Sequence, residues 1–161
     1  MSPDLEKKLT KKYPRLFQDK NKPDTETMIC YGCSCLDGWY QLLDECLFKL
    51  DKYPIKLSQV KEKFGELVIY YDFENENEDT EDAKNINIIN EISDTIEGYR
   101  NKSITICEIC GNSGGLTTRG GWFQTLCHSH RKDDYKSYHK EEIENNDRKI
   151  NLNIIYEDEE Y

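Results

Sequence analysis

The sequence has no long hydrophobic run. No stretch approaches the roughly 20 apolar residues that a membrane-spanning helix needs. Residues 1–10, MSPDLEKKLT, also lack the apolar region of a signal peptide. We therefore expect an intracellular protein that does not bind membranes.

Familiar catalytic motifs are missing as well. The chain contains no His-Glu-x-x-His, no glycine-rich phosphate loop with a lysine, and no Gly-x-Ser-x-Gly elbow. A nuclease of the His-Asn-His type would need a histidine between Ile104 and Leu126, and none occurs there. A metal-dependent hydrolase or nuclease is therefore an alternative that the sequence does not support, and we expect a non-catalytic protein.

Apolar residues are scarce and charged residues are abundant. Of 161 residues, 36% are hydrophobic and 34% are charged, which predicts a small core that a bound metal would help to stabilise. The formal net charge of −10 opposes non-specific coating of nucleic acid, because the phosphates would repel it. Basic residues nevertheless dominate residues 7–22. Nucleic-acid binding through this segment, Arg119 and Arg131 is therefore a second functional alternative.

What the sequence does contain is two pairs of metal-ligand residues. Cys107 and Cys110 form a Cys-x-x-Cys pair followed by Gly111, and Cys127 and His130 form a Cys-x-x-His pair after 16 intervening residues. The first pair is typical of a tight knuckle, and the second places both ligands on one side of the first turn of a helix. Together they predict one structural Zn²⁺ with four protein ligands and no open position for water or substrate.

Other ligand sets are weaker. His128 competes with His130, but it would point elsewhere on a helix, and His139 is expected at the surface. A second zinc site would use the remaining cysteines, Cys30, Cys33, Cys35 and Cys46. Their spacing is irregular, and Cys46 falls on the apolar face of a predicted helix. Buried thiols are therefore the favoured interpretation of this group.

Hydrophobic spacing predicts an α+β fold. Apolar residues at helical period predict amphipathic helices over residues 4–12, 39–50 and 86–99. Asp37 is expected to cap the second helix. Alternating residues predict strands at Ile55–Lys61 and Glu66–Phe73, with a turn at Lys63–Gly65. We expect a small antiparallel sheet packed by two or three helices, with a C-terminal treble-clef-like zinc finger.

The domain organisation follows from these elements. The body is expected at residues 1–102, with an acidic linker at about residues 74–82, followed by the finger at 103–147 and an acidic tail at 148–161. In the finger, short strands are predicted at Ile104–Ile106 and Trp122–Leu126, with the glycines between them in turns. A last short strand is predicted at Ile150–Tyr156.

Several segments, taken together, resemble a known family. They are Tyr13–Phe17, Asp37–Tyr40, Gln59–Leu67, Ile106–Gly111 and Arg119–Cys127. In this order, over about two-thirds of the chain, they resemble a family of small uncharacterised proteins encoded by tailed phages and some other viral or mobile genomes. The resemblance implies a viral source, a location in the host cytoplasm or the virion, and a metal-bearing C-terminal finger. It implies no activity, and the additional Cys30 and Cys33 depart from the family pattern.

The expected function is therefore that of a zinc-containing viral accessory protein that binds a host or viral protein without catalysis. Zinc would hold the finger rigid, so that its exposed residues are presented without a large ordering cost on binding. Asp37–Trp39 and Lys61–Gly65 are candidates for the binding surface. A helix cap with a core anchor and a turn glycine explain these two segments equally well. The sequence gives no indication of oligomeric state.

Overall fold

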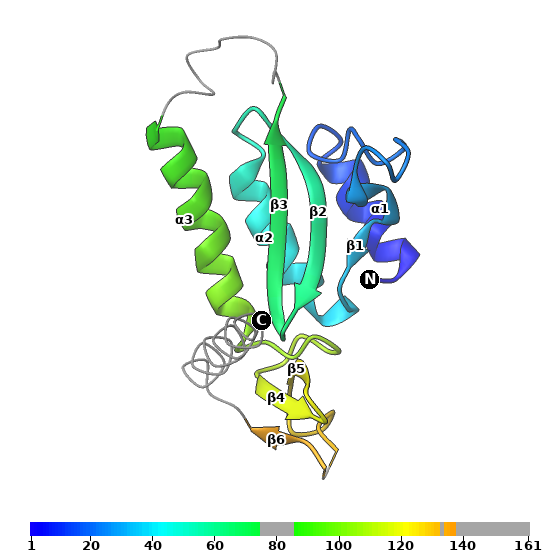
Figure 1. Ribbon diagram of the computed structural model, residues 1–161, viewed down its shortest axis with the longest axis vertical. Coiled ribbons are helices and arrows are strands. Elements are labelled where there is room, and N and C mark those ends of the chain that lie inside the picture. The colour runs from blue at the N-terminus through cyan, green and yellow to red at the C-terminus, as the bar shows by residue number, and fades with distance from the viewer. Residues whose placement is uncertain (75–85, 133, 138–161) are drawn as a thin grey trace, which may run out of the picture.

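The structure is a computed structural model that describes residues 1–74, 86–132 and 134–137. Four of the sequence predictions lie wholly or largely outside these residues: the acidic linker at 74–82, His139, the strand at Ile150–Tyr156 and the tail at 148–161. The described part is α+β, with three α-helices and two small sheets (Figure 1). The predicted α+β class is thereby confirmed.

The three predicted helices are present. They are α1 (Pro3–Lys12), α2 (Tyr40–Leu50) and α3 (Ile86–Ser103). Asp37 does not cap α2 as predicted, because a short 3-10 helix at Asp37–Trp39 precedes it. The Asp37 Oδ1 instead accepts a hydrogen bond of 2.6 Å from the Ser2 N–H. This contact ties the start of the chain to the turn that leads into α2.

The body sheet is mixed, although the sequence predicted an antiparallel one. Its strands are β1 (Cys33–Ser34), β2 (Ile55–Lys63) and β3 (Glu66–Phe73), in the order β1-β2-β3. The predicted β2–β3 hairpin is confirmed, with Val60 opposite Ile69. β1 pairs in parallel with β2, because the chain passes through α2 before it returns to the sheet.

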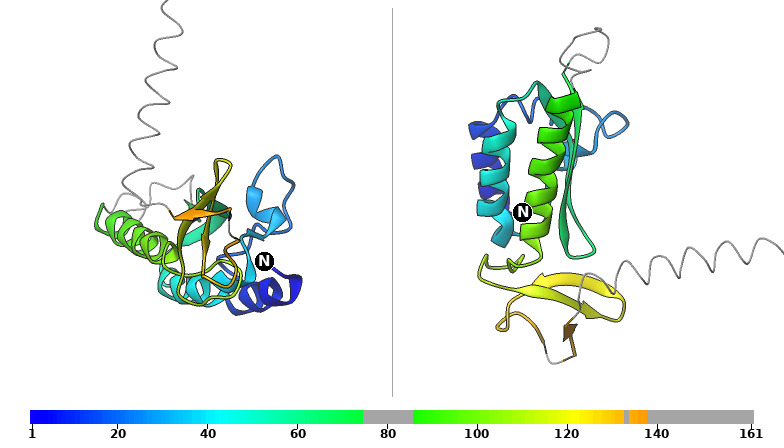
Figure 2. Two further views of the ribbon diagram at one scale, coloured as in Figure 1. Left: turned by 90° about the horizontal axis from the view of Figure 1, so that it is seen from below. Right: turned by 90° about the vertical axis from the view of Figure 1, so that its left-hand side faces the viewer.

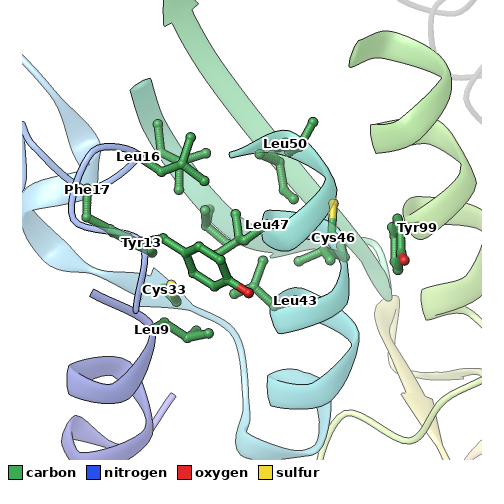
Figure 3. Close-up of a cluster of buried hydrophobic side chains, with 14 of the residues drawn as sticks. Leu9, Tyr13, Leu16, Phe17, Cys33, Leu43, Cys46, Leu47, Leu50 and Tyr99 are labelled. Atoms are coloured by element: carbon green, nitrogen blue, oxygen red, sulfur yellow. The ribbon is translucent and has the colours of Figure 1, made fainter. Parts of the chain in front are cut away.

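The hydrophobic core lies between the body sheet and the helices. α2 covers one face of the sheet and α3 runs beside β3 (Figures 1 and 2). Leu67 and Ile69 of β3 point into this core, whereas Tyr70, the residue after Ile69, is exposed. Figure 3 shows the centre of the core, where side chains from α1, the segment after it and α2 pack together. The largest fully buried side chain is Trp39.

The second sheet belongs to the C-terminal part of the chain. Its strands are β4 (Gly115–Arg119), β5 (Trp122–Leu126) and β6 (Lys136–Ser137), in the order β5-β4-β6. β5 was predicted and β4 was not, since the flanking glycines were assigned to turns. The strand predicted at Ile104–Ile106 is wrong, because only Ile106 forms a single bridge, with Ser113. We refer to residues 103–137 as the finger.

Among the described residues, none of the helices combines the length and the apolar character that crossing a bilayer demands.

Candidate metal centre

The two predicted ligand pairs meet at one end of the finger. The Sγ atoms of Cys107, Cys110 and Cys127 and a ring nitrogen of His130 all lie within 4.8 Å of one another. Cys110 Sγ is 3.7 Å from Cys127 Sγ. The His130 Nδ1 is 3.6 Å from Cys107 Sγ and 3.2 Å from Cys127 Sγ. No other group of this kind occurs among the residues that the structure describes.

These distances fit a tetrahedral metal site. With metal–sulfur bonds of about 2.3 Å and metal–nitrogen bonds of about 2.0 Å, the edges of a tetrahedron are about 3.8 Å between sulfurs and about 3.5 Å between sulfur and nitrogen. The 3.7 Å and 3.6 Å separations match these edges, and the third is slightly shorter. The cluster can therefore hold a metal ion with little movement of its side chains.

Backbone hydrogen bonds shape the knuckle that carries the first pair. The Gly111 N–H donates to the Cys107 carbonyl at 2.8 Å, and the Cys107 N–H donates to the Asn112 carbonyl at 2.8 Å. Gly111 has a φ of +77°, which favours glycine at this position of the turn. The knuckle is thus closed by the backbone, and its two thiols converge on the same point.

The second pair lies in a turn and not in a helix as predicted. The N–H groups of His130 and Arg131 both donate to the Cys127 carbonyl, at 3.1 and 3.0 Å. The described residues that follow form turns and β6. A single turn is sufficient to bring His130 to the cysteines. His128 is exposed and stands outside the cluster.

The sulfur atoms have unequal acidities. Desolvation raises the pKa of Cys127, but hydrogen bonds from the backbone and the ring of His130, and from the neighbouring thiols, outweigh it and lower this pKa to about 6. A backbone hydrogen bond from Asn112 lowers the pKa of Cys110, yet desolvation and the sulfurs of Cys107 and Cys127 raise it overall. Cys127 is therefore a thiolate at neutral pH, which is the form that binds metal.

The knuckle sits directly on the Asp37–Trp39 segment of the body. The Gly38 N–H donates to the Glu108 carbonyl at 2.8 Å, and the Trp39 Nε1–H donates to the Ile106 carbonyl at 2.8 Å. The buried Glu108 also accepts a 3.0 Å hydrogen bond at Oε1 from the Leu36 N–H. Asp37–Trp39 therefore docks the knuckle, a role that the sequence did not reveal.

A second junction joins the β2–β3 turn to the finger sheet. The Thr125 Oγ1–H donates to the Gly65 carbonyl at 2.7 Å. A Cβ on Gly65 would collide with Leu116 Cδ1, and its φ is +80°. Both segments that the sequence offered as binding surfaces thus serve, at least through their glycines, to fix the finger to the body.

The other four cysteines do not form a metal site in the described structure. Cys33, Cys35 and Cys46 are buried in the core, where Figure 3 shows Cys33 and Cys46 among leucines and tyrosines. Cys30 is half-buried, and its Sγ–H donates to the Thr27 carbonyl. Burial raises the pKa of Cys33 and of Cys46 to about 12 and also raises that of Cys35. The three buried cysteines are therefore protonated core thiols.

Alkylation of the folded protein is expected to spare Cys33 and Cys46. With a pKa of about 12, only about 1 thiol in 100,000 is ionised at neutral pH, and the core also blocks access of the reagent. Mass spectrometry after iodoacetamide treatment should find both unmodified in the native protein and fully modified in denaturant. The half-buried Cys30 is the internal positive control. Rapid native modification of Cys46 would contradict its placement in the core.

Comparisons of this chain with protein-family models, with curated proteins and with solved structures find no match. Its function must therefore be inferred from the chemistry of its own residues.

Proposed function

We propose that this protein binds one structural Zn²⁺ through Cys107, Cys110, Cys127 and His130, and acts without catalysis as an interaction protein that binds a partner protein. The zinc stabilises the finger and holds it on the body. Three thiols and an imidazole are a ligand set that zinc prefers, and a filled shell has no position for a substrate.

The observation that carries this proposal is the place of the ligand cluster. Its knuckle contacts the Asp37–Trp39 segment through backbone atoms of Cys107, Cys110 and Gly111. Losing the metal would therefore loosen the finger and also its contact with the Asp37–Trp39 segment of the body. A metal in this position fixes the surface of the finger relative to the surface of the body. A fixed arrangement lowers the ordering cost when a partner protein binds to both.

The biological setting is part of the same proposal. The resemblance of the five sequence segments to a phage and viral family supports a viral accessory protein acting on a host or viral protein. The order of the knuckle and the β4–β5 hairpin supports a treble-clef-like finger. A turn carries the second ligand pair where that fold has a helix.

The alternative of nucleic-acid binding loses much of its basis. Of the seven basic residues in 7–22, four form ion pairs with acids of the body: Lys12 with Asp44, Arg15 with Asp51 and Glu74, Lys20 with Glu6, and Lys22 with Asp19. In the finger, Arg119 pairs with Asp134 at 2.5 Å. These cations are already neutralised within the fold, so we do not propose phosphate binding by them.

Affinity purification from the cells that naturally produce the chain tests the proposal. The tagged protein should contain about one zinc per chain, as the four-ligand cluster implies, and should retain a protein at fixed stoichiometry. Cys110→Ser is the matched variant, and it should lose both zinc and partner. Retention of nucleic acid that is released as salt rises, with no protein partner, would overturn the interaction function.

A further inference from the structure

The tips of two hairpins meet beside the junction of body and finger. The β2–β3 tip carries Phe64 and the β4–β5 tip carries Trp122. Between them lies a hollow of about 230 Å³, which we call the hairpin slot. Its lining residues are Glu62, Lys63, Phe64, Gly121, Trp122 and Phe123.

Phe64 has a backbone conformation that is unfavourable for phenylalanine. Its φ is +55°, and among the described residues it is the sole non-glycine with a positive φ. Together with Gly65 at +80°, it forms a two-residue hairpin turn of the kind that favours Asn-Gly. A phenylalanine there is strained, so the turn itself does not explain the residue.

Burial in a core does not explain why aromatic residues occupy positions 64 and 122 either. Phe64 is 48% exposed and Trp122 is 66% exposed. Phe64 makes one edge-to-face contact with Phe123, at 6.2 Å between ring centroids. Large aromatic side chains that are exposed around a hollow are typical of the energetic centre of a protein interface.

The slot is held in shape by its surroundings. The Thr125 hydroxyl bonds to the Gly65 carbonyl, which fixes one tip against the finger sheet. Gly120 and Gly121, with φ of +57° and +83°, form the tight turn of the other tip. A partner would therefore bind with little ordering of the slot.

One lysine, Lys63, lines the slot. Its Nζ lies 5.5 Å from the centre of the Phe64 ring. Within the described ranges Lys63 forms no ion pair. The carboxylate of Glu62 is turned toward the backbone, where it accepts a 2.5 Å hydrogen bond from the Gly65 N–H. Lys63 is therefore left without a carboxylate partner in the slot, which favours a ligand that supplies one.

We propose that the hairpin slot binds a segment of the partner protein in which an apolar side chain, placed against Phe64 and Trp122, is followed by a carboxylate, placed beside Lys63. This inference rests on the proposed interaction function and names its surface. The size of the hollow suits one side chain, and the negative net charge opposes a longer polyanion, so a peptide is favoured over a nucleic-acid strand.

A labelled short synthetic peptide with one phenylalanine followed by a single glutamate tests the slot on the zinc-loaded full chain. Binding, followed by fluorescence anisotropy, should weaken about tenfold or more in Trp122→Ala and in Lys63→Glu. It should also shield tryptophan emission from acrylamide, because Trp39 is fully buried and Trp122 is exposed. Replacing the phenylalanine of the peptide by alanine is the matched control, and it should remove most of the affinity.

Phe64→Asn separates this role from a structural one. Asparagine suits a positive φ, so the variant should unfold at the same or a higher temperature than the parent while binding the peptide about tenfold more weakly. A lower unfolding temperature with unchanged affinity would make Phe64 a packing residue and overturn the proposal. Absence of peptide binding, displacement of the peptide by oligothymidylate, or pairing of two copies through the slot would overturn it too. If slot variants keep the natural partner and Cys110→Ser loses it, the interaction function stands and uses another surface.

Discussion

Replacing Cys127 by serine is expected to abolish zinc retention. The Cys127 sulfur lies 3.7 Å from that of Cys110 and 3.2 Å from His130 Nδ1, so it is in contact with a ligand of each pair. Its pKa of about 6 makes it a thiolate at neutral pH, and a serine hydroxyl offers no comparable anion. We expect zinc affinity to fall by more than about a hundredfold, since changes to mere supporting residues already reduce it 10- to 100-fold.

Elemental analysis after extensive dialysis measures this effect. The parent should retain about one zinc per chain and Cys127→Ser almost none. His128→Ala is the matched control, because His128 is adjacent, exposed and outside the cluster. Zinc at full stoichiometry in Cys127→Ser would refute the proposed centre. Loss of zinc in His128→Ala would mean that the wrong histidine has been assigned.

The ligand cluster was accessible from sequence because short spacings restrict local geometry. Cys107 and Cys110 are close enough that one knuckle brings their sulfurs together, and Cys127 and His130 are joined by a single turn. What the spacing could not provide was the type of turn. Residues i and i+3 are adjacent both in a helix and in an isolated turn, and the described residues after Cys127 adopt the latter.

Long periodic segments of the body were predicted better than short ones. The apolar period of α2 and α3 and the alternation in β2 and β3 repeat often enough to define each element. β1 has two residues and no pattern to detect, so the parallel pairing that makes the sheet mixed could not be foreseen. β4 was missed because it begins with Gly115, although its Leu-Thr-Thr sequence favours a strand.

The junction of body and finger is a tertiary feature, and no local pattern encodes it. Gly38 reads as a residue near a helix start, whereas in the structure its importance comes from a knuckle about 70 residues later in the chain. Gly65 reads as a turn glycine, and it also lies against Leu116 and Thr125. Such double roles become visible only when the two parts of the chain are in contact.

Gly38→Ala is expected to destabilise both the junction and the metal centre. A Cβ at position 38 would lie 2.5 Å from the Gly111 nitrogen and 2.6 Å from the Cys110 nitrogen, and closer still to the Cys107 carbonyl oxygen. All three are backbone atoms of the knuckle, so no side chain can rotate away. The knuckle or the Asp37–Trp39 turn must shift. Overpacking of this kind costs about 1–3 kcal/mol, which corresponds to a fall of about 2–12 °C in the unfolding temperature.

Gly98→Ala is the matched control for this glycine substitution. Gly98 lies within α3, is exposed, and has no atom within 4 Å of the added Cβ, so alanine should stabilise the protein by about 0.5–1 kcal/mol. Calorimetry should therefore show opposite changes in stability for the two variants. A zinc-chelator competition should show zinc affinity lowered about tenfold in Gly38→Ala only. If Gly38→Ala lowers the unfolding temperature but leaves zinc affinity unchanged, the knuckle closes independently of its seat. The metal would then stabilise the finger alone, and the coupling between cluster and body on which the interaction function depends would be absent.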